Sequence, residues 1–331
     1  MRRRAFITLL GGATIAFPLA AIAEQRMRRV GMLNNNVASD TFYQQYVAGF
    51  VETLRNLGWE EGRNLRLDVR WNGGDASLAR SYAAELVALS PDVIFSASTT
   101  NLMALQQVTQ TIPIVFAQVS DPVAQGFVPS LIRPGGNLTG FTNFEFSIGG
   151  KWVELLKQVA PDLSRVAVMS NPDTSPQTKY FLQAIETAAA SLGLQVVVTP
   201  VRSIADIEAA IENFARQPNG GLILPTDSFT SLHRKLIADS ANRFRLPAIS
   251  GVSDNFLSVG GLLYYGSVFG LGEQYQQAAA YVDRILKGAK PGDLPVQLTT
   301  SFRFGINLKT AKAMGIAVPI PLLGRADVVI E

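Results

Sequence analysis

The chain has 331 residues, 47% of them hydrophobic, and it contains no cysteine, which excludes disulfides, thiolate catalysis and cysteine metal sites. Its formal charge of +3 comes from Arg2, Arg3 and Arg4, because the remaining 26 basic residues balance 26 acidic ones. Composition therefore gives no support for a basic nucleic-acid-binding surface, and no nucleic-acid partner is expected.

The first 23 residues have the pattern of an export signal. Arginines come first, an apolar run follows, and small residues end it at Ala23, where we expect cleavage. Arg3 and Arg4, followed by bulky apolar residues, resemble the twin-arginine export motif, with ordinary Sec export as the alternative. The apolar run is short for a membrane-spanning helix. We expect a soluble protein exported to the periplasm.

Beyond the signal, β-rich apolar runs alternate with helical patterns, which is typical of βαβ units around parallel sheets. The first half predicts, in order, a strand at 29–33, a helix from Ser39 or Asp40 to about Leu57, a strand at 65–71, a helix at 76–89, and strands at 92–97 and 112–119. Gly58 follows the end of the first helix, where a residue with a left-handed backbone conformation commonly ends a helix. Ser98 is expected to cap the start of the helix after the third strand.

The pattern then repeats. Four segments of the first half are similar to later ones: "RVGMLNN" at 29 to "RVAVMSN" at 165, "LGW" at 57 to "LGL" at 192, "VIF" at 93 to "LIL" at 222, and "IPIV" at 112 to "LPAI" at 246. The offsets are 136, 135, 129 and 134 residues. A single large sheet is the alternative, but length and repetition together favour two similarly wound α/β lobes.

The chain must pass between these lobes more than once. A turn-rich break at 133–137 precedes an extended segment, and after the second repeat come a strand near 260, a helix from about Leu271 to Lys287, and a further extended run. Several crossings would make a hinge over a ligand cleft. We predict lobe 1 from 24–142 with 266–296, and lobe 2 from 143–265 with 297–331.

Ligands in parallel α/β sheets bind beyond the carboxyl ends of the strands, so polar residues there are the candidates. The predicted ligand-binding residues are Asn34, Ser98, Thr99, Asp121, Asn143, Asn171, Asp227 and Tyr264. Ser98 and Thr99 stand at a helix start that favours an anionic group. Asp121 and Asp227 would approach one bound ammonium, although each is also a common turn or cap residue. Tyr264 is placed to stack on a ligand.

Catalytic motifs are scarce. The only histidine, His233, lies in a helical run away from the strand ends, and the sequence has no Walker loop, nucleophile elbow or metal-binding histidine pair. We expect no enzyme activity, no metal and no cofactor. The one enzymatic alternative is a hydrolase that uses Asp121 and Asp227 as a carboxylate pair.

Several segments carry a family resemblance: "RRRAFITLLGG", "ELVALSPDVIFSAST", "IPIVFAQVSDPVAQGFVPSLIRPGGNLTGFTNFE", "GGKWVELLKQVAP", "YVDRILKGAKPGDLPVQ" and "INLKTAKAMGI". Together they resemble the ABC-transporter substrate-binding proteins of the tryptophan/tyrosine-binding (TrpX-like) type, over essentially the whole chain. The resemblance implies a type I periplasmic-binding-protein fold, with two Rossmann-like lobes joined by three crossings, that delivers a small molecule to an ABC permease.

The resemblance also bears on residues. Ser120-Asp121-Pro122 and Ser98-Thr99 match the family's cleft segments on the first lobe, with Asn171 and Asp227 on the second. We therefore expect Asp121 to act as a clamp for an ammonium or amide of the ligand, with Ser98 and Thr99 at an anionic end. Amino acids, aromatic ones in particular, are the leading ligands, and a monomer is expected. A periplasmic sensor for a membrane receptor is the alternative that keeps the same cleft.

Overall fold

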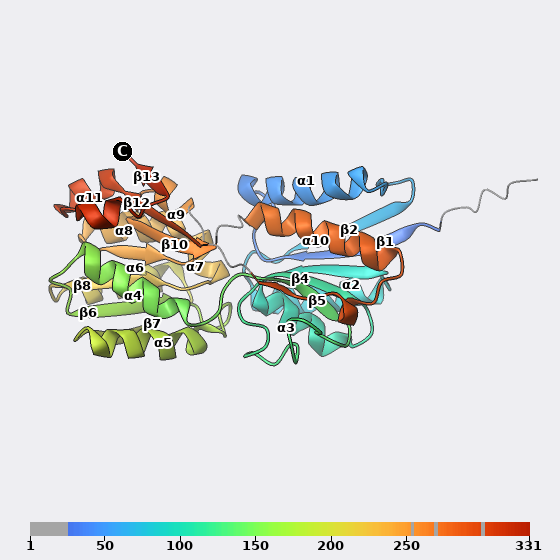
Figure 1. Cartoon of the computed structure of the whole chain (residues 1–331), viewed down its shortest axis with the longest axis horizontal. Helices are drawn as coiled ribbons and strands as arrows, with labels where there is room; N and C mark the ends of the chain where they lie inside the picture. Colours follow the sequence, from blue (N-terminus) through green and yellow to red (C-terminus); the bar gives the residue numbers. More distant parts are fainter. Residues whose placement is uncertain (1–25, 253–254, 268–270, 299–301) are drawn as a thin grey trace, which may run out of the picture.

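The computed structural model describes residues 26–252, 255–267, 271–298 and 302–331. The predicted export signal, with its twin-arginine motif, lies outside these residues. The described chain forms two α/β lobes that lie end to end along the longest axis of the molecule (Figure 1). None of the described helices has both the length and the apolar character that a membrane crossing requires.

The first lobe is built on a six-stranded parallel sheet with the order β11-β5-β4-β3-β1-β2. Its strands are β1 (Arg28–Asn34), β2 (Leu65–Trp71), β3 (Val93–Ala97), β4 (Ile114–Val119), β5 (Leu138–Thr142) and β11 (Gln297–Leu298). Its helices are α1 (Thr41–Asn56), α2 (Ala76–Ala88), α3 (Thr99–Val108) and α10 (Leu271–Leu286), with a short 3-10 turn at Pro291–Asp293.

The second lobe is built on a seven-stranded sheet with the order β13-β12-β10-β9-β8-β6-β7. Its strands are β6 (Arg165–Ser170), β7 (Gln195–Pro200), β8 (Gly220–Leu224), β9 (Ala248–Ser250), β10 (Leu263–Ser267), β12 (Phe302–Asn307) and β13 (Val328–Ile330). Its helices are α4 (Ile148–Val159), α5 (Thr178–Ser191), α6 (Ile204–Ala215), α7 (Ser228–Leu232), α8 (Arg234–Arg243), α9 (Asn255–Ser258), α11 (Leu308–Met314) and α12 (Ile320–Leu323).

The two sheets are wound alike. The order β5-β4-β3-β1-β2 in the first matches β10-β9-β8-β6-β7 in the second. Among the described residues, β10 with β12 is the only antiparallel pair in either sheet. The repeated segments at 29 and 165, 93 and 222, and 112 and 246 fall on β1 and β6, β3 and β8, and β4 and β9. The predicted α/β class with mostly parallel sheets is confirmed, and the sequence repeat reflects the common winding.

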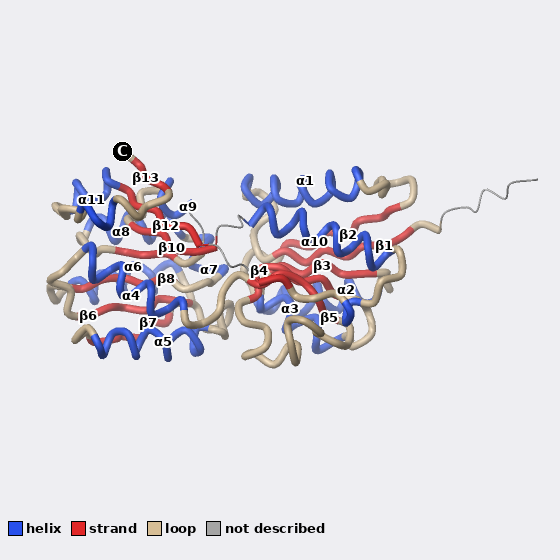
Figure 2. The backbone as a smooth tube through the Cα atoms, in the orientation of Figure 1, coloured by secondary structure: helices blue, strands red, loops and turns tan. Residues whose placement is uncertain are grey.

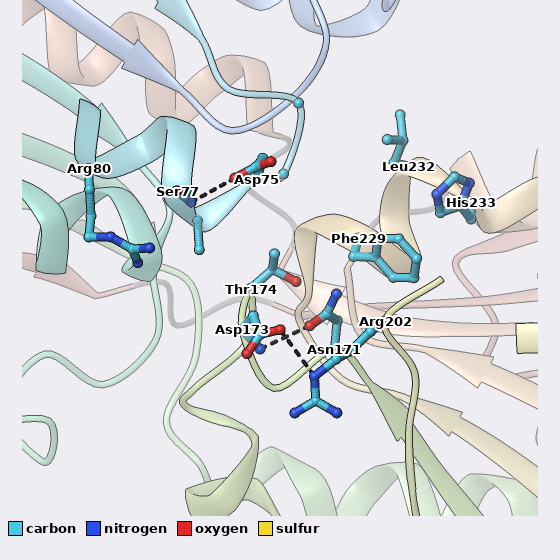
Figure 3. A pocket seen from close by; sticks show the side chains of 13 residues that line it. Asp75, Ser77, Arg80, Asn171, Asp173, Thr174, Arg202, Phe229, Leu232 and His233 are labelled. Atoms are coloured by element: carbon cyan, nitrogen blue, oxygen red, sulfur yellow. Dashed lines mark hydrogen bonds and ion pairs between the residues drawn. The ribbon is translucent and has the colours of Figure 1, made fainter. Parts of the chain in front are cut away.

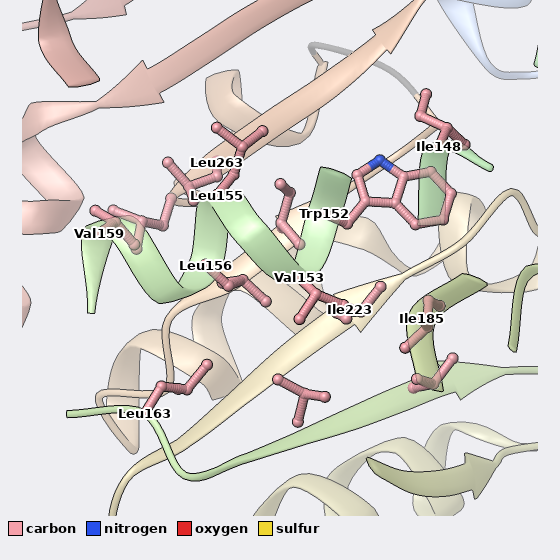
Figure 4. Close-up of a cluster of buried hydrophobic side chains, with 14 of the residues drawn as sticks. Ile148, Trp152, Val153, Leu155, Leu156, Val159, Leu163, Ile185, Ile223 and Leu263 are labelled. Carbon is pink, nitrogen blue, oxygen red and sulfur yellow. The ribbon is translucent and has the colours of Figure 1, made fainter. Parts of the chain in front are cut away.

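Each sheet is covered by helices on both faces (Figure 2). Along β3, Val93 and Phe95 pack with α1 and α10, while Ile94 between them packs with α2 and α3. This alternation follows from the two-residue period of a strand. In the second lobe, α4 presents its apolar side to β8 and β10, where Trp152 is fully buried (Figure 4).

Strand pairing also shows where the chain changes lobe. Gly266 and Ser267 pair within the second sheet, and Gln297 and Leu298 pair within the first. By this measure the chain changes sheet two residues later at each place than the boundaries predicted from the sequence. One crossing of the expected hinge, between β5 and α4, is described, whereas the other two fall on 268–270 and 299–301, outside the described residues.

Candidate functional site

A small cavity of about 40 Å³ lies between the two lobes, and we call it the interlobe cavity. It is lined by Asn35, Tyr43, Ser98, Thr99, Gln118 and Asn143 of the first lobe and by Thr174, Gln177, Thr226, Asp227, Ser228, Ser231 and Val252 of the second. Asn35, Ser98 and Asn143 directly follow β1, β3 and β5, and Thr226 follows β8. The site thus forms where the carboxyl ends of both parallel sheets face each other.

Ser98 and Thr99 lie at the start of α3 and line the interlobe cavity. Ser98 has a positive φ of 89°, and its hydroxyl accepts a hydrogen bond from the backbone N–H of Asn101 at 3.3 Å, which caps α3. The neighbouring Thr99 hydroxyl is buried without a hydrogen-bond partner. A helix start with a free hydroxyl favours an anionic group of a ligand.

Gln118 reaches the cavity because β4 contains a bulge. The register with β5 runs from Phe116 opposite Gly140 to Val119 opposite Thr142, so β4 carries one extra residue. Gln118 there has a φ of 59°, and its backbone N–H donates to Oε1 of Gln274 at 3.0 Å. Bulges of this kind redirect a side chain next to a functional site. Gly140 is required, since a Cβ atom would lie 2.0 Å from the Phe116 carbonyl oxygen.

Asp227 lines the cavity, but its carboxylate is occupied by the protein. Its oxygens accept hydrogen bonds from the backbone N–H groups of Asn171 (2.8 Å), Phe229 (3.0 Å) and Thr230 (3.3 Å) and from the Thr174 hydroxyl (2.5 Å). It is the N-cap of α7. Burial raises the pKa of Asp227, and these four hydrogen bonds oppose the rise. The carboxylate therefore organises the second-lobe wall instead of offering free oxygens to an ammonium.

Four predicted residues do not line the interlobe cavity. Asp121 accepts a hydrogen bond from the backbone N–H of Ala124 at 3.0 Å, so it closes the turn after β4. Tyr264 is buried and donates its hydroxyl to the Ser267 carbonyl oxygen, and Asn34 accepts from the Tyr275 hydroxyl. Asn171 accepts from the backbone N–H of Asp173. The predicted meeting of Asp121 and Asp227 on one ligand group is not formed.

Asn171 instead lines an outer groove of about 580 Å³ between the lobes (Figure 3). The outer groove contains Gly73, Gly74, Asp75, Ala76, Ser77 and Arg80 from the first lobe and Asn171, Asp173, Thr174, Arg202, Phe229, Leu232 and His233 from the second. Thr174 belongs to both spaces. His233 lies here with its ring against Phe229, and burial lowers its pKa while Asp227 opposes the shift.

Five buried polar atoms on the cavity walls have no hydrogen-bond partner. They are Oδ1 of Asn35, Oγ1 of Thr99, Nε2 of Gln118, Oδ1 of Asn143 and Oε1 of Gln177. Buried polar groups are satisfied in the great majority of native structures. A group of five in one place is therefore what a polar ligand would complete. No described set of His, Asp or Glu side chains is arranged to hold a metal ion.

The lobes also touch each other directly around the cavity. Nδ2 of Asn35 lies 2.8 Å from the Ser228 hydroxyl, and the Thr100 hydroxyl donates to the Thr174 carbonyl oxygen at 2.9 Å. The hydroxyls of Ser120 and Thr226 are 3.4 Å apart. These contacts place the structure in a closed arrangement.

Part of the site was visible in the sequence and part was not. Asn35, Thr226 and Ser228 are polar residues that closely follow strands, the kind of position from which the candidates were drawn. Tyr43, Gln118, Thr174 and Gln177 lie within α1, within a bulge or beyond the strand ends. Only the bulged register and the closure of the lobes bring these four to the cavity, and no local motif signals either.

The model of the family described as "ABC transporter substrate binding protein" matches residues 34–330. The chain belongs to this family. It therefore captures a small molecule for an ABC transporter. A tyrosine-binding protein of Clostridioides difficile (strain R20291) is 27% identical over 270 residues, which cover 80% of this chain and 75% of that protein.

Two solved structures share the fold of this substrate-binding protein. An ABC domain in complex with L-Trp from Streptococcus pneumonia is 24% identical with a TM-score of 0.80, over 92% of this chain and 100% of that one. The ligand-free, open structure of a substrate-binding protein with adhesive properties from Clostridium difficile is 25% identical with a TM-score of 0.63, over 92% and 99%. The TM-score is higher for the structure with bound L-Trp than for the ligand-free one. The type I periplasmic-binding-protein fold expected from the sequence is confirmed.

Proposed function

We propose that this chain is an exported solute-binding protein that holds an amino acid or a related polar or aromatic compound in the interlobe cavity and delivers it to an ABC permease. The observation that carries the proposal is the set of five unpaired buried polar atoms around one closed cavity. The names of the relatives, which refer to tyrosine and to L-Trp, support an amino acid.

The proposed binding residues are those of the predicted set that line the cavity, namely Ser98, Thr99, Asn143 and Asp227, joined by Asn35, Gln118 and Gln177. Asp227 contributes by fixing Asn171 and Thr174 on the second-lobe wall. We propose that the two lobes, divided as the sheets divide them, close over the solute by a hinge at the crossings.

Substrate-binding proteins of ABC transporters generally work outside the cytoplasm. We propose export by the N-terminal 23 residues with cleavage near Ala23, a periplasmic location, and action as a monomer that docks on its permease. Binding without turnover is the proposed activity. A receptor-linked sensor would use the same cavity, but family membership favours transport.

The hydrolase alternative has little support from the geometry. It needs two carboxylates on one substrate, whereas Asp121 caps a turn outside the cavity and both oxygens of Asp227 accept hydrogen bonds from the protein. A pair with these contacts cannot share a proton and a water between them.

The test is the melting temperature of the mature chain against a library of amino acids, aromatic acids, nucleosides and sugars. A solute that binds only the native state stabilises it by RT ln(1 + [L]/Kd), about 2.7 kcal/mol at a hundredfold excess over Kd. We expect a shift with amino acids and none with nucleosides or sugars. A shift confined to sugars or nucleosides would contradict the proposal.

A further inference from the structure

We propose that an ion pair between Asp40 and Arg234 favours the closed arrangement of the lobes and makes closure sensitive to ionic strength. Asp40 belongs to the first lobe and Arg234 to the second, and we call the two the interlobe ion pair. The inference rests on the hinge closure of the proposed function, but on no particular solute. It assigns a role to two residues that do not line the interlobe cavity.

The interlobe ion pair lies about one helical turn away from the cavity on both walls. Asp40 is the N-cap of α1, and Tyr43 in the first turn of that helix lines the cavity. Arg234 begins α8 and follows α7, in which Ser231 also lines the cavity. Nη1 of Arg234 donates to the Ser231 carbonyl oxygen at 2.9 Å, which holds the guanidinium beside that wall. The pair therefore joins two segments that form the cavity.

Arg234 makes two contacts with the first lobe. Its Nη1 lies 3.7 Å from Oδ2 of Asp40, and its Cζ lies 5.9 Å from the centroid of the Phe42 ring. A guanidinium within about 6 Å of an aromatic ring is attracted to the face of that ring. Both attractions grow as the distance between the lobes falls, so both favour closure.

Burial strengthens the interlobe ion pair in the closed arrangement. The Asp40 side chain is 8% exposed and that of Arg234 is 20% exposed, and Nε of Arg234 is buried without a hydrogen-bond partner. Exposed ion pairs contribute little, whereas partly buried ones are screened less by salt. When the lobes separate, both charges return to water and counter-ions. Added salt should therefore favour the open arrangement.

Two substitutions each remove one charge and keep the local structure. Asp40→Asn retains the helix cap, because asparagine caps helices as well as aspartate does. Arg234→Gln retains a good helix former. The matched control is Arg70→Gln, because Arg70 also pairs with a carboxylate, that of Glu85, and donates to a backbone carbonyl, but entirely within the first lobe.

The experiment measures the distance between spin labels on Gln107→Cys and Lys179→Cys by pulsed electron resonance. These two residues are exposed and line a groove between the lobes. The mature chain is unfolded, dialysed and refolded first, which removes any bound solute. We expect a short, closed distance beside a longer, open one, and a ratio of closed to open molecules that falls about threefold in Asp40→Asn and in Arg234→Gln.

The double variant should lose no more than either single variant, because the two changes remove the same interaction. Raising the ionic strength from about 20 mM to about 500 mM should lower the ratio in the parent and leave it unchanged in the variants. Arg70→Gln should behave as the parent does. Asp40→Asn alone carries the comparison if the melt of Arg234→Gln shows a folding defect.

Four results would overturn the proposal: no closed distance in the parent at any ionic strength, equal ratios in the parent and both charge variants, losses that add in the double variant, or an equal loss in Arg70→Gln. The proposed function is tested separately by the melts with added solutes. If the ratios respond as expected and no solute shifts the melt, only the proposed solute fails. If an amino acid shifts the melt and the ratios are all equal, only the interlobe ion pair fails.

Discussion

At the scale of single residues, two aspartates that follow strands have the same local role, which is to accept hydrogen bonds from nearby backbone N–H groups. Asp121 and Asp227 both follow strands at the edge that faces the other lobe, and the sequence predicts the same clamp role for both. In the structure each carboxylate accepts nearby backbone N–H groups, as Asp does in turns and at helix starts. The atoms left free at the cavity belong to uncharged amides and a threonine.

The first prediction separates the two kinds of residue. Asp121→Ala should leave solute affinity within about twofold of the parent, because its side chain closes a turn outside the cavity. Asn143→Leu should lower affinity on the order of tenfold, since it removes an unpaired acceptor from the wall. Calorimetry with any solute that raises the melting temperature checks both. A large loss of solute affinity in Asp121→Ala would contradict this prediction and support direct contact between Asp121 and the ligand.

The second prediction concerns an ion pair at the far side of the first lobe. Arg29 of β1 donates to Asp68 of β2 at 2.7 Å, and this hydrogen bond lowers the pKa of the Asp68 carboxyl. A lowered pKa means that the stability from the pair is present above the unfolded carboxyl pKa, near 4, and is lost as the pH falls through the folded value.

Asp68→Asn should therefore melt below the parent at pH 7, and the gap should close as the pH falls well below 4. Asp239→Asn serves as the control, since its pair with Lys235 is exposed and should matter little at any pH. A gap between parent and Asp68→Asn that stays constant down to acid pH would show that the ion pair is not its cause.

At the scale of elements, strands and helices are where the sequence predicted the structure best. The apolar runs at 29–33, 65–71 and 92–97 fall on β1, β2 and β3, and Gly58 takes the left-handed φ expected of a C-cap. The bulge in β4 and the turn that moves Gln177 to the cavity were not predictable. Both depend on how one segment registers with another far along the chain, which local periodicity does not record.

The third prediction uses two adjacent glycines of α4. A Cβ on Gly149 would lie 2.9 Å from Cγ1 of Ile185 and 3.0 Å from the Phe181 carbonyl oxygen, whereas a Cβ on Gly150 would meet only ordinary contacts from 3.5 Å. Gly149→Ala should destabilise by about 1–3 kcal/mol through overpacking against α5.

Gly150→Ala should be neutral or stabilise by up to about 1 kcal/mol, because alanine costs less than glycine in a helix. Chemical denaturation of both variants measures the difference. Equal effects in the two would mean that the packing of α4 on α5 does not discriminate between the positions.

At the scale of the whole molecule, function depends on two similarly wound sheets whose strand ends face each other. Duplicate winding places the carboxyl ends of both sheets at one interface, where the proposed hinge would let the lobes close on a solute. Direct contacts such as Asn35 with Ser228 join the two lobes in this structure. The sequence predicted the two lobes from its repeat, whereas the pairing of residues across the interface required the structure.

The most direct test is the distance between the lobes with and without solute. Because the chain has no cysteine, Gln107→Cys and Lys179→Cys give two unique spin-label sites, both exposed and on opposite sides of a groove between the lobes. A solute that raises the melting temperature should shorten the label distance measured by pulsed electron resonance, because it is enclosed by closure. A solute that stabilises the protein while the distance stays unchanged would show that it binds elsewhere, and would contradict an interlobe site.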